Sequence, residues 1–75
     1  MLELQAPLWL YGSGAVRLTF SSTEPIQARL TVDRQVVDEQ LVQGKSVSDV
    51  RLEGERWHEV LVDASMPGLH LTVSR

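Results

Sequence analysis

The chain has 75 residues, no cysteine and a net charge of −3, with 43% hydrophobic and 23% charged residues. This length predicts one domain over residues 1–75, and the lack of cysteine excludes disulfides and thiolate metal sites. The acidic excess lies in residues 38–75, which hold four basic and seven acidic residues. With no basic stripe to attract phosphate, neither nucleic acid nor an anionic membrane surface is expected as a partner.

Targeting signals are not apparent. The first fifteen residues contain no lysine or arginine, and the apolar run at 8–11 is too short for a secretory signal. No stretch approaches the length of a membrane span, so membrane insertion is not expected. The compartment stays open: cytoplasmic by default, or exported if the chain is a module of a longer protein.

The N-terminal third predicts three extended segments. Residues 1–5 predict an edge strand that proline interrupts, and residues 8–11 a second strand. After the Gly-Ser-Gly turn, residues 15–20 alternate between apolar and polar, which predicts a strand with one buried face. Residues 21–25, SSTEP, predict a loop. The inward positions of the third strand are Val16, Leu18 and Phe20.

Residues 26–41 carry the clearest pattern, a strand, a tight turn and a second strand. Alternation is strict over the first eight residues, which indicates one dry and one wet face. Asp33 begins the turn, because aspartate bonds its own backbone and tolerates turn geometry. The register of 35–41 stays open, since neither face is purely apolar. A helix over 34–41 is the rival interpretation, but paired valines favour a strand.

The C-terminal half alternates loops and strands. Loops are predicted at 42–46, 53–55 and 63–68, and strands at 47–52, 56–62 and 69–73. Ser48, Val50 and Leu52 share one face of the first of these strands, His58, Val60 and Val62 share the core face of the second, and Leu69, Leu71 and Val73 point inward on the third. About seven short strands with turn signals every 8–12 residues predict an all-β fold. The expected architecture is a small antiparallel β-sandwich of jelly-roll or immunoglobulin-like kind.

No catalytic residue, metal or cofactor is predicted. His58 falls on the core face of its strand and His70 on the wet face of the last strand, and their spacing does not make them converge. Ser13 lies between two glycines without the strand-elbow-helix context of a hydrolase nucleophile. Most acids fall in turns or on outward faces, where acids are expected without a catalytic role. The acids considered are Asp38, Glu39, Asp49, Glu53, Glu55, Glu59 and Asp63.

The aromatic residues are the candidates for binding. Trp57 lies on the half-wet face of its strand, and Trp9 and Tyr11 share a face opposite Leu8 and Leu10. The register of 7–11 stays open. If the leucines face the core, the three rings form an exposed platform that suits a protein partner or a glycan. The alternative is that the rings cap a thin core.

Residues 44–73 resemble a known family. The matching positions are Gly44, Lys45 and Val47, then Arg56, Trp57, Val60 and Leu61, then Gly68, His70, Leu71 and Val73. This pattern is similar to the C-terminal β-sandwich module of thioredoxin-containing cytochrome c biogenesis proteins. Residues 30–33 also fit that family's strand before an Asp-Gly turn, although Arg34 replaces the glycine. The family's closing Phe-rich strand and Cys-x-x-Cys have no counterpart. The resemblance implies a carbohydrate-binding-like sandwich without catalysis.

Three functions follow from the sequence, in order of preference. The first is a non-catalytic interaction module that docks a protein or a glycan through Trp57, Trp9 and Tyr11. The second is a structural subunit that self-associates in a larger assembly, such as a virion or multi-subunit complex. A short chain without disulfides gains stability when its edge strands pair with a neighbour. The third, a hydrolase, requires a pocket that joins a histidine to a carboxylate.

Overall fold

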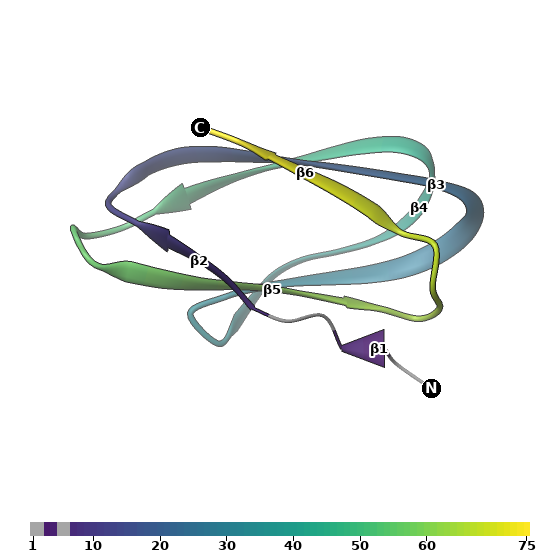
Figure 1. The fold of residues 1–75 in the computed structure, drawn as a ribbon, viewed down its shortest axis with the longest axis horizontal. Coiled ribbons are helices and arrows are strands. Elements are labelled where there is room, and N and C mark those ends of the chain that lie inside the picture. Colours follow the sequence, from purple (N-terminus) through teal and green to yellow (C-terminus); the bar gives the residue numbers. More distant parts are fainter. Residues whose placement is uncertain (1–2, 5–6) are drawn as a thin grey trace.

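The computed structural model describes residues 3–4 and 7–75. Its strands are β1 (Glu3–Leu4), β2 (Leu8–Tyr11), β3 (Gly14–Val32), β4 (Gln35–Leu52), β5 (Trp57–Ala64) and β6 (His70–Ser74). All pairings between them are antiparallel, so the all-β prediction is confirmed (Figure 1). The rest of the predicted first strand, residues 1–2 and 5, lies outside the described residues. In the described ranges there is no helix that could cross a membrane. The alternative prediction of a helix over 34–41 is wrong, because residues 35–41 belong to β4.

β3 and β4 are longer than predicted. The loops expected at 21–25 and 42–46 are wrong, because both segments continue a strand. Each wrong loop joins two predicted strands into one. The described part of the chain has six strands, where about seven were expected. The first of these segments is the corner where β3 bends. Its pairing with β4 is irregular between Ser22 and Ile26, and the Ser22 hydroxyl bonds the backbone of Glu24 in place of the ladder.

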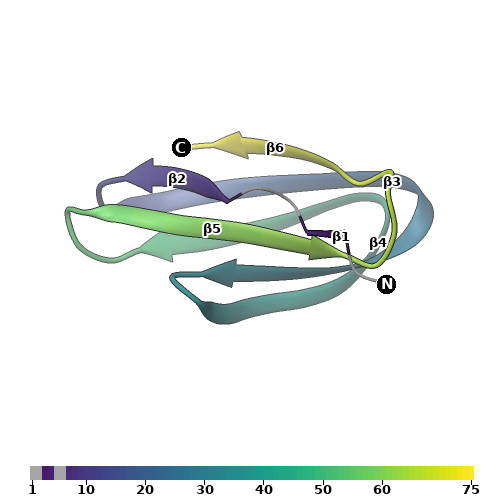
Figure 2. The ribbon, with the colours of Figure 1, turned by 60° about the horizontal axis from the view of Figure 1, so that its bottom comes forward.

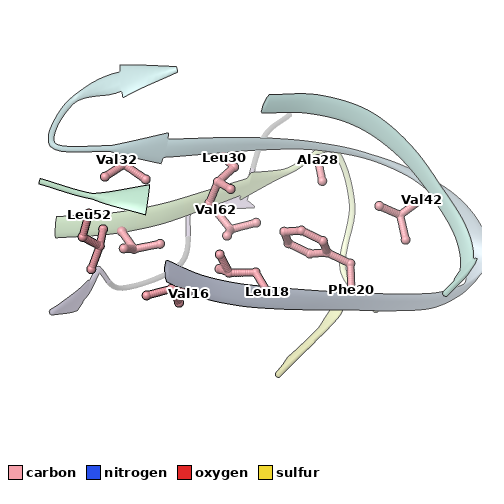
Figure 3. Packing of buried hydrophobic residues seen from close by; sticks show 10 residues of the cluster. Val16, Leu18, Phe20, Ala28, Leu30, Val32, Val42, Leu52 and Val62 are labelled. Carbon is pink, nitrogen blue, oxygen red and sulfur yellow. The ribbon is translucent and has the colours of Figure 1, made fainter. Parts of the chain in front are cut away.

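The long β3–β4 hairpin folds over on itself. The two halves of β3 face each other across the core (Figure 3). β6 pairs with the first half of β3, β5 pairs with the second half, and β2 and β1 pair with β5 (Figure 2). The predicted alternation of buried residues in β3 and β5 is confirmed. The buried cluster is Val16, Leu18, Phe20, Ala28, Leu30, Val32, Val42, Leu52, Val60 and Val62.

A two-residue turn connects the long strands. Val32 pairs with Gln35 across Asp33 and Arg34, whose φ angles are 50° and 68°. Two successive positive φ values define a type I′ turn, whose twist matches that of a hairpin. The predicted reversal is therefore confirmed, and Gln35 already belongs to β4.

A β-bulge determines the register of 35–41. Leu30 pairs with Asp38 but Thr31 pairs with Val36, so Val37 has no partner across the ladder and remains exposed. From the bulge onward the even-numbered residues face inward.

The inward side of β4 is partly polar. The side chains of Asp38, Gln40, Ser46 and Ser48 hydrogen-bond to one another between the two halves of β4. The sequence analysis did not predict this network, of which Ser48 is buried.

An aromatic surface on β2 and β5

The register between β2 and β5 sorts the residues of both strands onto two faces. Leu8 pairs with Val60 and Leu10 with His58, whereas Trp9 pairs with Glu59 and Tyr11 with Trp57. Directly opposed residues of an antiparallel pair share a face. Leu10 packs against the core, so the leucines lie on the core side and the aromatic rings on the outer side.

The three rings form one outer patch, here called the aromatic surface: Trp9, Tyr11 and Trp57. Their exposed fractions are 53%, 53% and 60%, so they do not cap the core. The ring centroids of Tyr11 and Trp57 lie 5.4 Å apart with planes inclined by 73°, an edge-to-face contact. The surface therefore offers a ridge of crossed rings rather than a flat platform.

An open groove of about 240 Å³ runs beside two of these rings, those of Trp9 and Trp57. It is lined by Trp9, Trp57, Asp33, Arg34, Arg56 and Glu59. The turn between β3 and β4 supplies Asp33 and Arg34, while the connection between β4 and β5 supplies Arg56. Cationic, anionic and aromatic groups thus border the same groove, a composition typical of surfaces that bind other macromolecules.

The connection at residues 53–56 supports the aromatic surface from one end. The Gly12 amide donates to the carbonyl of Arg56 at 3.0 Å, and the Ser13 hydroxyl donates to the carboxylate of Glu55 at 2.6 Å. The Tyr11 hydroxyl contacts the Glu55 carbonyl at 3.4 Å. Gly12 has a φ of 95°, and a Cβ atom there would meet Glu55 Oε2 at 3.3 Å. Glycine is therefore required where this connection touches β2.

Asp33 lines the groove and also contacts the buried His58. Its Oδ1 atom accepts the backbone amide of Glu59 at 3.0 Å. Its Oδ2 atom accepts from Arg56 at 3.2 Å and lies 2.8 Å from Nδ1 of His58. The other ring nitrogen, Nε2, lies 2.9 Å from the carbonyl of Gly54. His58 is fully buried, so the inward histidine of β5 anchors the turn and the connection at 53–56 from beneath.

The electrostatics of this cluster follow from its hydrogen bonds. The bond to Asp33 raises the pKa of His58 above its usual range, the bond to the Gly54 carbonyl adds to the effect, and burial opposes it. The bond from His58 lowers the pKa of Asp33, with further help from the Glu59 amide and Arg56. The Ser13 hydroxyl lowers the pKa of Glu55 in the same way.

Two further candidates from the sequence, His70 and Asp49, do not line the groove. His70, at the start of β6, is exposed and pairs with Ser21, so the two histidines lie on different strands. Asp49 forms an exposed ion pair with Arg17. In residues 3–4 and 7–75, no three histidine, aspartate or glutamate side chains form a group that could hold a metal ion.

The role of Asp33 was missed by the sequence analysis, which assigned it to the turn alone. A buried histidine requires hydrogen-bond partners, so the inward phase of His58 was a signal that a polar group approaches it. The sequence could not identify that group, because Asp33 is 25 residues away and its approach depends on how β3 pairs with β5. Searches against family models, curated proteins and solved structures found no match to this chain.

Proposed function

We propose that this chain is a non-catalytic binding module, a small β-sandwich of immunoglobulin-like or jelly-roll kind, that docks a protein partner through its aromatic surface. The observation that carries the proposal is the exposure of more than half of each aromatic residue on one outer face. Tryptophan, tyrosine and arginine dominate the binding energy of protein interfaces. All three types meet here, because Arg34 and Arg56 border the groove.

Two features favour a protein over a glycan. The inclined rings of Tyr11 and Trp57 cannot stack on successive sugar rings in one plane, whereas side chains of a partner can insert beside them. The groove volume of about 240 Å³ is also below the roughly 300–1,000 Å³ of small-molecule pockets. A glycan remains the ligand that the resemblance to the cytochrome c biogenesis module implies, and the experiment below tests for it.

Replacing Trp57 with alanine is expected to weaken binding strongly without unfolding the chain. A displayed random-peptide library selected on the immobilised protein supplies the probe, and the selected peptide is then titrated. We expect Trp57→Ala to raise Kd by about 30-fold or more, the loss typical of a hot-spot residue. Leu41→Ala is the matched control, because Leu41 is 63% exposed on β4 and lies outside the groove; its Kd should stay within a factor of about two.

Circular dichroism of both variants shows whether the fold is kept. Equal peptide binding by the wild type and a folded Trp57→Ala variant would contradict the proposal. A glycan array probed in parallel decides the ligand class: binding to glycans alone, lost in Trp57→Ala, would replace the protein partner with a glycan.

Self-association is the second candidate function, and the free edge of β4 favours it. Among the described strands, β4 pairs with β3 alone, so the backbone groups along its other edge can accept a further strand. The ladder with β3 is regular from Gly44 to Leu52. An antiparallel pair of two copies centred on Val50 sets Asp49 of each copy opposite Arg51 of the other, a favourable cross-strand pair made twice.

Charge reversal at Arg51 tests this second function. Arg51→Glu sets like charges opposite each other in the pair, so a dimer measured by analytical ultracentrifugation should dissociate to monomer. Arg34→Glu makes the same change in net charge at the β3–β4 turn and should leave the dimer intact. A wild-type chain that sediments as a monomer at high concentration would contradict self-association through this edge.

A further inference from the structure

His58 is the one histidine of this chain with no exposed surface, and it uses both ring nitrogens. Nδ1 lies 2.8 Å from Oδ2 of Asp33, and Nε2 lies 2.9 Å from the backbone oxygen of Gly54. Both distances are those of good hydrogen bonds. The ring therefore bridges the β3–β4 turn and the connection at residues 53–56.

Both partners of the ring are acceptors. A backbone carbonyl oxygen only accepts, and an ionised carboxylate only accepts. Asp33 is held ionised because it also receives the Glu59 amide and the Arg56 guanidinium. A neutral imidazole has one N–H, so one of its nitrogens would direct a lone pair at an oxygen lone pair. The geometry is therefore satisfied when both nitrogens carry a proton and the ring is an imidazolium.

The bridge reaches the aromatic surface by two routes. Through Asp33 it holds Arg56, which lines the groove beside Trp57. Through Gly54 it holds the connection whose next residue, Glu55, contacts the Tyr11 hydroxyl. A change in the protonation of the ring therefore affects two groups beside the proposed binding surface, although His58 itself has no exposed atom.

We propose that His58 is a positioning residue that holds the aromatic surface in its binding arrangement as a doubly protonated ring, and that the surface reorganises when His58 loses one proton. The remaining proton stays on Nδ1, where it faces the negative charge of Asp33. Nε2 then directs its lone pair at the Gly54 oxygen, and residues 53–56 separate from the ring. The consequence for binding rests on the proposed function, whereas the reorganisation does not.

The charged groups around the ring come from two elements. The turn contributes the Asp33 carboxylate, and the connection contributes the Arg56 guanidinium and the Glu55 carboxylate. On β2 the residue opposite His58 is the uncharged Leu10. Asp33 stabilises the charged ring and Arg56 opposes it, and the contact with Asp33 has the larger effect on the pKa of His58. The proton is therefore held beyond the usual range of histidine and is lost on the alkaline side.

Nuclear magnetic resonance of the free protein tests the proposal from about pH 5 to about pH 9. Ring-nitrogen shifts report the protonation of His58, and the indole N–H signals report the positions of Trp57 and Trp9. We expect His58 to titrate above its usual value and the Trp57 signal to follow with the same midpoint. His70→Gln removes the exposed histidine and should leave both curves unchanged. His58→Gln should abolish the titration of the Trp57 signal.

Two results would overturn the proposal: ring-nitrogen shifts of a neutral tautomer at about pH 6, or a Trp57 midpoint that His58→Gln leaves in place. If His58→Gln does not fold, Asp33→Asn replaces it, because asparagine tolerates the left-handed turn and removes the charge. Asp33→Asn should lower the His58 and Trp57 midpoints together, and an unchanged His58 midpoint would contradict the bridge. No partner is needed, so failure here is distinct from failure of the peptide selection.

Discussion

Replacing Phe20 with alanine should lower the free energy of unfolding by about 3–5 kcal/mol, the usual cost of truncating a buried phenylalanine. Phe20 is 1% exposed and lies in the buried cluster where the two halves of β3 face each other (Figure 3). A chain of 75 residues has a total stability of roughly 4–11 kcal/mol. The substitution therefore removes a large share of the stability, or all of it.

Urea denaturation monitored by tryptophan fluorescence measures this loss. The control is Leu41→Ala, which also truncates a large apolar residue, but at a position 63% exposed on the outer side of β4. Its effect should stay within about 0.5 kcal/mol. Equal denaturation midpoints for the two variants would show that the core is not where β3 folds back, and the architecture would be wrong.

The second large effect is the dependence of stability on pH. Stability should be greatest between the ordinary pKa values of aspartate and histidine, about 3.8 and 6.5, and should fall on both sides of that range. His58 has a raised pKa in the folded chain, so its contribution is complete below about pH 6.5 and is lost as pH rises through the folded value. Asp33 has a lowered pKa, so its contribution is present above about pH 3.8 and is lost as pH falls through the folded value.

Chemical denaturation at a series of pH values tests both limbs. The alkaline limb should disappear in His58→Gln and persist in His70→Gln. The acid limb is shared with Glu55 and Asp49, whose pKa values are also lowered, so Asp33→Asn should weaken it without removing it. Parallel curves for the wild type and His58→Gln above about pH 6.5 would show that the ring is not charged in the folded chain.

Alternation along the chain predicted which residues are buried in β3 and β5. Ile26, Leu30 and Val32 are buried as their phase requires, and so are His58 and Val62. This part of the fold is local, because successive side chains of an extended chain point to opposite faces whatever the strand pairs with. The same rule put Trp9 and Tyr11 on one face of their strand and Trp57 on the half-wet face of another, but that the three rings share one outer face depends on how β2 pairs with β5.

The two wrong loops have a common cause. Residues 21–25 contain serine, threonine and proline, and residues 42–46 contain Gly44, a composition typical of loops. The same residues also suit the corner of a long bent strand. A bend leaves some backbone N–H and C=O groups without a partner across the ladder, and proline and serine tolerate such positions. Composition cannot separate these cases, since the difference depends on whether β3 and β4 stay paired on both sides of the bend.

What could be learned without coordinates is the class of the fold and the face on which most side chains of its strands lie, because both depend on the spacing of neighbours along the backbone. What required coordinates is which faces meet. Backbone hydrogen bonds form in the same way whatever the side chains are. The alternation alone therefore could not predict that the hairpin folds over, that Val37 forms a bulge, or that Asp33 reaches His58. Those contacts join residues far apart in sequence, and the pairing of whole strands selects them.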